Sequence, residues 1–224
     1  MNRFRGRLLL LLLLWMAAIA LALLVDTRVA QWVHDSTPLH KDSWLVRLVR
    51  LPGNYVFVLG AGVVLLLLDR RRWVAALPVI LSGPAVGASY VLLKWIVGRR
   101  RPVLEIAPFT LHPFMHGLKG LILSVSGLSF PSGDATMAFA AAACMAVALP
   151  RWSVAFFAWA VLVAAERVLE NAHYVSDVVA GAGLGILCAW VAVLISRRIL
   201  TRKPDRQVDG AASMRTLAPA AAAD

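Results

Sequence analysis

A histidine and an aspartate four residues apart, His173 and Asp177, stand between two long apolar runs, Trp152–Ala165 and Val178–Ile195. Ionisable side chains beside a membrane are costly to place, and they commonly mark a functional site. Residues at this spacing share one face of a helix, so the carboxylate can bond one imidazole nitrogen. Such a bond fixes the tautomer and leaves the other nitrogen free to attack or to take up a proton. The alternative is a polar helix end with a structural ion pair.

Cationic residues that suit phosphate occur in two places. Arg167, six residues before the histidine, offers a planar fork that matches phosphate oxygens. Lys94 and Arg101 lie seven residues apart in the stretch Lys94–Pro102. On a helix they would point nearly the same way, about 10 Å apart along the axis, and could hold one phosphate or a diphosphate. The alternative is a set of cations that extend from the membrane interface toward the headgroups.

A third polar stretch, Phe130–Asp134, opens another apolar run. Proline is favoured in the first turn of a helix, where the backbone N–H groups lack internal partners. Gly133 allows a ligand to approach the backbone closely, and Ser132 adds a hydroxyl donor, so this stretch is a candidate anion site. The alternative is an ordinary helix start that Ser132 or Asp134 caps.

The apolar runs that separate these stretches indicate an all-α membrane protein. Of the 224 residues, 60% are hydrophobic, well above the roughly 45–50% of soluble domains. We expect a polytopic helical bundle of six transmembrane helices in one domain over residues 1–200, and a disordered cytoplasmic tail over residues 201–224. The expected spans are Leu8–Val25, Tyr55–Leu68, Trp73–Leu93, Ser132–Leu149, Trp152–Ala165 and Tyr174–Ile195.

The distribution of arginine orients this bundle. Three arginines in Met1–Arg7 place the N-terminus in the cytoplasm. The first apolar run could be a cleaved signal peptide, but no small-residue cleavage site leads into a polar mature start, so we prefer an uncleaved span. Residues 26–51 then form an outer loop, whose short helix lies among the headgroups or packs on the protein. Residues 103–130 are expected to form a loop and short helix at the same surface.

The net charge of +11 does not indicate a nucleic-acid partner. The lysines and arginines lie between the apolar runs, as topology determinants do. One cluster falls on the outer side against that rule, and this placement indicates an anionic ligand. Its members are Lys94, Arg99, Arg100 and Arg101.

The remaining candidates for metal or redox chemistry are weak. Cys144 and Cys188 both lie inside apolar runs, where free thiols behave as small hydrophobes. His112 and His116 have the spacing of a metal-binding pair, but Pro113 between them argues against a regular helix and no third ligand is evident. We therefore expect no metal site.

Taken together, the three polar stretches resemble the signature of the type 2 phosphatidic acid phosphatase (PAP2) superfamily. The six-span layout resembles that family over roughly residues 1–200. The matching motifs lie within residues 94–177 and are Lys94-x6-Arg101-Pro102, Pro131-Ser132-Gly133 and Arg167-x5-His173-x3-Asp177.

The resemblance implies a membrane phosphatase that works through a phosphohistidine intermediate, without a metal or another cofactor. His173 would be the nucleophile and Asp177 would orient it. Substrates across the family are mostly phosphorylated or diphosphorylated lipids, so the expected partners are such a lipid and the surrounding membrane lipids. We expect a bacterial cytoplasmic membrane, with the site facing the periplasm or exterior. The implied ligands of the phosphate oxygens are Lys94, Arg101, Ser132, Gly133 and Arg167.

Two positions depart from the family pattern. Asp134 stands where the family usually has the histidine that protonates the leaving group, and Glu166 stands where it usually has serine. Asp134 can act as the acid only if burial or a neighbouring carboxylate, such as Glu166 or Glu170, keeps it protonated. Otherwise the leaving group must need little protonation, as a phosphate that leaves a diphosphate does. We therefore predict a preference for a diphosphate lipid, such as a polyprenyl diphosphate.

Two alternatives share these residues. The protein would be a lipid phosphotransferase if the phosphoryl group passed to a lipid acceptor, as in family members that phosphorylate lipid A from a diphosphate donor. It would be a catalytically silent relative that binds or transports lipid if the altered acid position abolished turnover. Phosphate release and transfer of a labelled phosphate to a lipid distinguish the three hypotheses.

Overall fold

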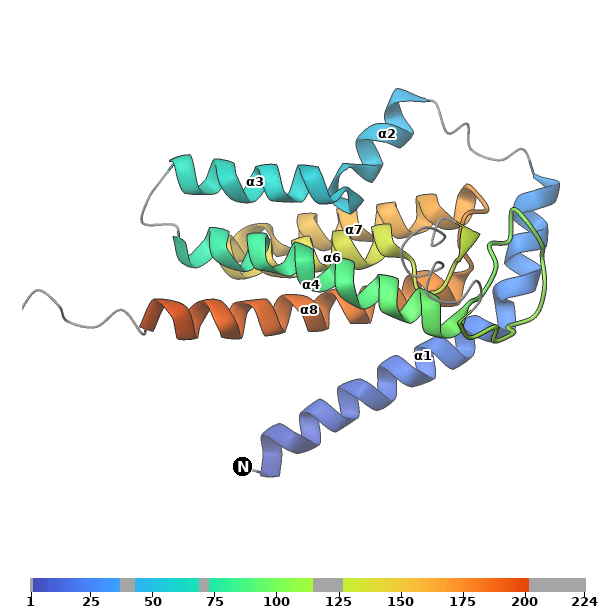
Figure 1. The fold of residues 1–224 in the computed structure, drawn as a ribbon, viewed down its shortest axis with the longest axis horizontal. Coiled ribbons are helices and arrows are strands. Elements are labelled where there is room, and N and C mark those ends of the chain that lie inside the picture. The colour runs from blue at the N-terminus through green and yellow to red at the C-terminus, as the bar shows by residue number, and fades with distance from the viewer. Residues whose placement is uncertain (1, 37–42, 69–72, 115–126, 202–224) are drawn as a thin grey trace, which may run out of the picture.

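The computed structural model describes residues 2–36, 43–68, 73–114 and 127–201, and it is helical throughout these ranges apart from short loops and one isolated β-bridge. Figure 1 shows the helices in chain order. The helices and short 3-10 turns (η) are α1 (Asn2–Asp35), α2 (Trp44–Arg50), η1 (Leu51–Gly53), α3 (Tyr55–Leu68), α4 (Trp73–Val97), α6 (Gly133–Ala148), η4 (Pro150–Trp152), α7 (Ser153–Leu169) and α8 (Val175–Thr201).

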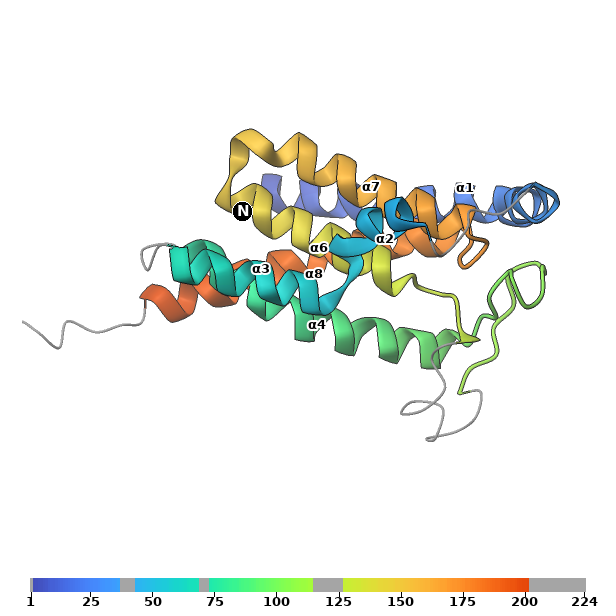
Figure 2. The same cartoon turned by 90° about the horizontal axis from the view of Figure 1, so that it is seen from above.

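Helices α3, α4, α6, α7 and α8 run side by side along the long axis, while α1 crosses them at an angle and meets α8 near one end (Figures 1 and 2). Helix α6 packs against α4, α7 and α8, and its inner positions are mostly alanine. Small residues allow the backbones of membrane helices to approach closely. At Gly185 of α8, an added Cβ atom would lie 2.2 Å from the carbonyl oxygen of Thr136.

Each of the six expected spans coincides with a helix, so the prediction of an all-α bundle is confirmed, whereas the number six is not. Within the described ranges, α1, α4, α7 and α8 are long and apolar enough to cross a membrane. The segments Trp44–Gly53 and Tyr55–Leu67 pass this test only as one pair, bent by 66°. Helix α6 has 16 residues and is shorter than a full span.

The first helix is longer than predicted, and the prediction of a loop over residues 26–51 is therefore partly wrong. Helix α1 continues to Asp35, because no proline or glycine occurs between Val25 and Asp35. Asp26, Ala30 and Val33 recur at helical spacing and are all buried. Asp26 therefore faces the bundle instead of lying in an outer loop.

Helix α2 packs on the protein, which is one of the two alternatives for the short helix in this loop, and its placement among headgroups stays a prediction. Ser43 caps it by accepting a hydrogen bond from the N–H of Val46. Val46 is buried, and the indole of Trp159 in α7 donates a hydrogen bond to the carbonyl of Val49 at 2.9 Å. Trp44 remains 76% exposed, so one face packs on the protein and the other is free to lie among headgroups.

Two predictions lie outside the described residues. The disordered tail expected over residues 201–224 falls almost entirely on residues 202–224, and part of the loop and short helix expected over residues 103–130 falls on residues 115–126.

The close packing of α6 and α8 gives a stability prediction. Replacing Gly185 with alanine forces the two backbones apart, and we expect a destabilisation of about 1–3 kcal/mol, seen as a lower midpoint of thermal unfolding in detergent. Gly60→Ala in α3 is the control, because no atom lies within 4 Å of its added Cβ. Equal midpoints for both variants would contradict this packing.

Candidate active site

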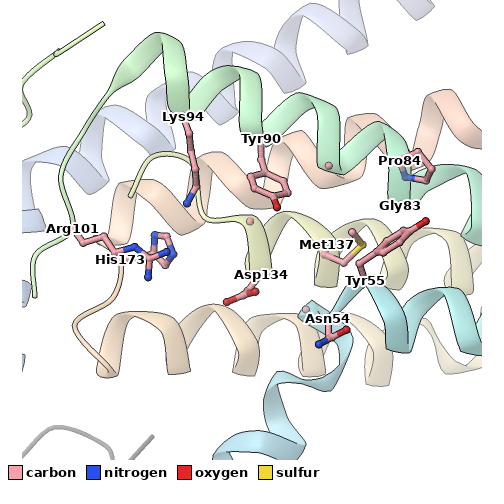
Figure 3. Close-up of a pocket in the computed structure, with 13 residues that line it drawn as sticks. Asn54, Tyr55, Gly83, Pro84, Tyr90, Lys94, Arg101, Asp134, Met137 and His173 are labelled. Carbon is pink, nitrogen blue, oxygen red and sulfur yellow. The ribbon is translucent and has the colours of Figure 1, made fainter. Parts of the chain in front are cut away.

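A pocket of about 770 Å³ opens between α3, α4 and α6. Figure 3 shows Lys94, Arg101 and His173 at one end, with Tyr55 and Pro84 toward the other. The pocket thus joins an ionic end to a long, mostly apolar groove. Its lining residues are Gly53, Asn54, Tyr55, Gly83, Pro84, Gly87, Tyr90, Lys94, Arg101, Gly133, Asp134, Met137 and His173.

Lys94 and Arg101 meet through a turn after α4, not along one helix as predicted. The helix ends at Val97, and Gly98 adopts a φ of +66°, where an added Cβ would lie 1.9 Å from a carbonyl oxygen. The chain then reverses and pairs with the segment at Leu128. The Lys94 ammonium donates to the carbonyl of Leu128 at 2.8 Å, and Arg101 Nε donates to the same oxygen at 3.4 Å. One carbonyl therefore brings both cations together.

His173 lies in the loop that connects α7 to α8. The backbone N–H groups of Ala172 and His173 both donate to the carbonyl of Arg167 at 3.2 Å, which folds the loop back onto the end of α7. Asn171 enables this turn with a φ of +57°. The imidazole is buried, and its face toward the pocket lies beside Arg101 (Figure 3).

The imidazole and the carboxylate predicted to orient it are close but not hydrogen-bonded. His173 Nδ1 lies 3.6 Å from Asp177 Oδ2, beyond hydrogen-bond length. The same oxygen accepts a hydrogen bond from the N–H of Tyr174 at 2.8 Å. Contacts of this kind often shorten when a substrate binds. With Nδ1 facing the carboxylate, Nε2 is the nitrogen left for the pocket.

Burial lowers the pKa of His173 to about 4, against the raising effect of Asp177; Lys94 and Arg101 add smaller lowering effects. The ring is consequently neutral at physiological pH. A neutral imidazole keeps the lone pair that an attack on phosphorus requires.

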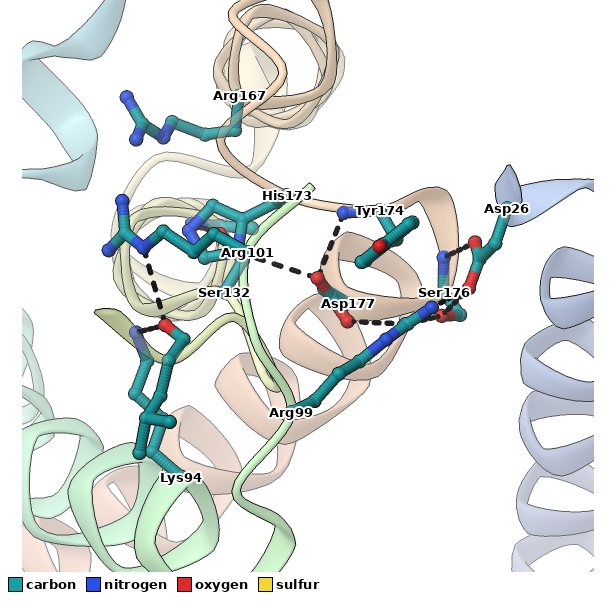
Figure 4. Close-up of polar contacts among 12 residues, drawn as sticks. Asp26, Lys94, Arg99, Arg101, Ser132, Arg167, His173, Tyr174, Ser176 and Asp177 are labelled. Carbon is teal, nitrogen blue, oxygen red and sulfur yellow. Dashed lines mark hydrogen bonds and ion pairs between the residues drawn. The ribbon is translucent and has the colours of Figure 1, made fainter. Parts of the chain in front are cut away.

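Arg167 extends into the same region from the last turn of α7, and Figure 4 shows its guanidinium on the same side of His173 as that of Arg101. It is buried and pairs with three carboxylates, those of Asp134, Glu166 and Glu170. Its Nε lies 3.0 Å from Asp134 Oδ2, and its Nη1 donates to Glu170 Oε2 at 2.6 Å.

Asp134, Glu166 and Glu170, the candidate acid and its expected neighbours, each pair with a guanidinium group. Glu166 and Glu170 both pair with Arg50, which reaches across from α2. Asp134 pairs with Arg167. This arrangement offers no support for the condition under which Asp134 would stay protonated and act as the acid.

The start of α6 is built as a capped helix. Ser132 is fully buried, and its Oγ accepts a hydrogen bond from the N–H of Ala135. Its own N–H donates to the carbonyl of Asp177 at 3.1 Å, which joins the starts of α6 and α8. Gly133 lines the pocket but Ser132 does not. Phosphate binding by these two residues stays a prediction.

One ionic network at the site was not predicted. Arg99 donates to Asp177 Oδ1 and to Asp26 Oδ2, both at 2.9 Å (Figure 4). The sequence offered little to single out Arg99, because it precedes Arg100 and Arg101 in one cationic run. The available signal in the sequence was Asp26, because a carboxylate on the buried face of α1 needs a cationic partner.

Among the described residues, no group of three or more histidine, cysteine or acidic side chains has the geometry of a metal site. His116, half of the weak candidate pair, lies outside these residues.

The fold and the pocket define a class of protein, an integral membrane helical bundle with a cluster of cations beside a buried histidine. A family model described as the PAP2 superfamily matches residues 73–200, more than half of the chain, and the protein belongs to this superfamily. The resemblance drawn from the three polar stretches is confirmed.

Two curated relatives and two solved structures are similar to the chain. It is 37% identical over 110 residues to a "Lipid A 1-phosphatase" of Rhizobium johnstonii, which covers 46% of this chain and 39% of that relative. A second "Lipid A 1-phosphatase", from Rhizobium etli, is 36% identical over 110 residues, which are 46% of this chain and 41% of the relative. The chain thus spans less than half the length of these relatives.

The solved structures share the fold. Aquifex aeolicus LpxE aligns with a TM-score of 0.56 at 21% identity, covering 76% of this chain and 95% of that one. A transmembrane PAP2-type phosphatidylglycerolphosphate phosphatase from Bacillus subtilis aligns with a TM-score of 0.57 at 22% identity, covering 85% and 96%.

The buried environment of His173 gives a spectroscopic prediction. In the folded protein, labelled with ¹⁵N-histidine in detergent, the His173 ring should keep the chemical shifts of a neutral imidazole from pH 8 down to about pH 5. In the denatured chain the same ring should titrate near ~6.5. The His173→Asn variant identifies the signal. Titration of this signal near pH 6.5 in the folded protein would contradict the burial described here.

Proposed function

We propose that this protein is a membrane lipid phosphatase that removes phosphate from a phosphorylated or diphosphorylated lipid. The main observation in support is that Lys94, Arg101 and Arg167 converge beside the neutral imidazole of His173. Like charges at close range repel, and a bound phosphate group would relieve that repulsion. The printed names of the two curated relatives also support a lipid phosphatase.

In the proposed reaction, His173 Nε2 attacks phosphorus as the bond from phosphorus to the leaving oxygen breaks. The phosphohistidine that results is then attacked by water, which yields inorganic phosphate and restores the imidazole. Asp177 stabilises the positive charge that the ring acquires. The three cations stabilise the negative charge on the equatorial oxygens in both transition states.

The pairing of Asp134 supports a leaving group that needs no acid. Asp134 Oδ2 forms an ion pair with the Arg167 guanidinium at 3.0 Å, so we do not assign it as the acid. A phosphate that leaves from a diphosphate carries its charge readily, whereas an alkoxide does not. We therefore propose a preference for diphosphate lipids, with a polyprenyl diphosphate as the specific candidate.

The other end of the pocket suits a lipid chain. Gly87 leaves room along α4, the ring of Tyr55 of α3 packs closely on Gly83, and Met137 also lines the pocket. Residues beyond the cations are mostly uncharged or apolar, so the phosphate and the chain can be bound at opposite ends (Figure 3). We further propose that the ionic end faces the periplasm or exterior of a bacterial cytoplasmic membrane, as the arginines at the start of the first helix indicate.

The substrate preference is tested by phosphate release from purified protein. We expect at least tenfold higher kcat/KM with a polyprenyl diphosphate than with phosphatidate. His173→Ala should lower the rate by about 1000-fold or more, because no other group replaces the nucleophile. His34→Ala, at an exposed position of α1, is the matched control and should retain full activity.

The Asp134→Asn variant tests whether Asp134 acts as the general acid or only pairs with Arg167. We expect diphosphate hydrolysis to stay within about threefold of the unmodified protein, since no proton is required. Equal or faster turnover of phosphatidate by the unmodified protein would overturn the preference. A loss comparable to that of His173→Ala in the asparagine variant would show that Asp134 is the acid after all.

If the groove binds the lipid chain, a bulky side chain in it should impair the lipid substrate more than a soluble one. Gly87 has no atom within 4 Å of an added Cβ, so tryptophan at this position would fill the groove. Gly87→Trp should lower kcat/KM for the lipid substrate by about tenfold or more, yet leave hydrolysis of soluble p-nitrophenyl phosphate nearly unchanged. Ala88→Trp is the control, because Ala88 is exposed outside the pocket. Equal losses on both substrates would place the lipid chain elsewhere.

A further inference from the structure

The first helix supplies a buried carboxylate to the surroundings of the candidate nucleophile. Asp26 is 2% exposed, in the C-terminal half of α1. An isolated buried charge is strongly unfavourable, so a carboxylate in such a place needs partners. Asp26 has three: Arg99 Nη2 donates to Oδ2 at 2.9 Å, the N–H of Ser176 donates to Oδ1 at 2.9 Å, and the Ser176 hydroxyl donates to Oδ2.

Arg99 links this carboxylate to the one beside the imidazole. Its guanidinium is 2% exposed and lies between Asp26 and Asp177, with a separate N–H group donating to each. The ring of Tyr174 stacks on it, with the guanidinium carbon 3.6 Å from the ring centroid. A planar fork held on a flat ring has one orientation, so Arg99 fixes the spacing between the two carboxylates.

The network determines which oxygen of Asp177 faces His173. Arg99 occupies Oδ1, and Oδ2 is left on the side of the imidazole, 3.6 Å from Nδ1. Asp26 also accepts from the N–H of Ser176 in the first turn of α8, where N–H groups lack partners within the helix. Asp26 therefore fixes both the counter-ion of Asp177 and the start of the helix that carries it.

We propose that Asp26 and Arg99 are positioning residues for the His173–Asp177 pair, and that the first transmembrane helix thereby takes part in assembling the active site. Neither residue contacts the pocket. They act by holding Asp177 Oδ2 on the side of Nδ1, where the carboxylate favours a proton on that nitrogen and leaves Nε2 unprotonated. The kinetic consequence rests on the proposed phosphatase function, whereas the effect on the imidazole tautomer does not.

Asp26→Asn tests this proposal with little change in shape. The amide oxygen can still accept from Ser176, but the charge opposite Arg99 is lost. Arg99 then neutralises Asp177 more completely, and Asp177 becomes a weaker acceptor for the imidazole proton. The other charged groups that face His173, Lys94 and Arg101, remain as they are.

Two measurements on the full chain in detergent decide the question. At pH 7, ¹⁵N spectra of the His173 ring should show mainly the Nδ1–H tautomer in the unmodified protein and a larger fraction of the Nε2–H tautomer in Asp26→Asn. The kcat for lipid diphosphate should fall about 10- to 100-fold, as for other residues that orient a ligand through a partner, while KM changes less than threefold. Asp35→Asn is the matched control, because Asp35 is exposed near the end of the same helix and bonds only Gln31 among the contacts described.

A second variant distinguishes a positioning role from a general loss of structure. Arg99→Lys keeps the charge but cannot bond both carboxylates through one rigid fork, so it should give the same tautomer change and a similar fall in kcat. An unchanged tautomer in both variants would overturn the proposal, even if their activity fell. If the unmodified protein hydrolyses none of the lipids while the tautomer shifts as expected, the proposed function fails and the positioning role stands.

Discussion

Three cations, Lys94, Arg101 and Arg167, crowd one end of a pocket in a bundle that is otherwise apolar. Two of them are almost fully buried. Their mutual repulsion opposes folding, and it is offset only in part by the carbonyl of Leu128 and by the carboxylates of Asp134 and Glu170. A site arranged in this way is prepared for an anion with several oxygens, and the rest of the structure is organised to hold it.

Holding these charges requires parts of the chain that are distant in sequence. Gly98 turns the chain after α4 and brings Arg101 back toward Lys94, while the loop after α7 folds onto Arg167 and places His173 beside both. A separate ionic pair, Asp26 with Arg99, fixes Asp177 from the side of α1. Asp26 and Asp177 thus share the guanidinium of Arg99, and Asp134 pairs with that of Arg167.

The helices and the reactive residues could be predicted from the sequence, but their surroundings could not. Apolar runs located all six expected helical segments, since hydropathy reports directly on burial in lipid. Motif spacing selected Lys94, Arg101, Arg167 and His173, which the structure brings together. The roles of Arg50 and Asp26 depend on how α2 and α1 pack on the bundle, and no local pattern encodes such contacts. The predicted role of Asp134 as an acid required burial or a neighbouring carboxylate, and the fold leaves Asp134 partly exposed beside the guanidinium of Arg167.

The most direct test of the account is an experimental structure of the full chain with orthovanadate, which mimics the trigonal-bipyramidal geometry of phosphorus during transfer. We predict vanadium bonded to Nε2 of His173, with Lys94, Arg101 and Arg167 contacting its equatorial oxygens and Asp134 displaced from Arg167. Vanadate bound away from His173, or contacted by none of these cations, would contradict the central claim that this end of the pocket is built for phosphoryl transfer to the imidazole.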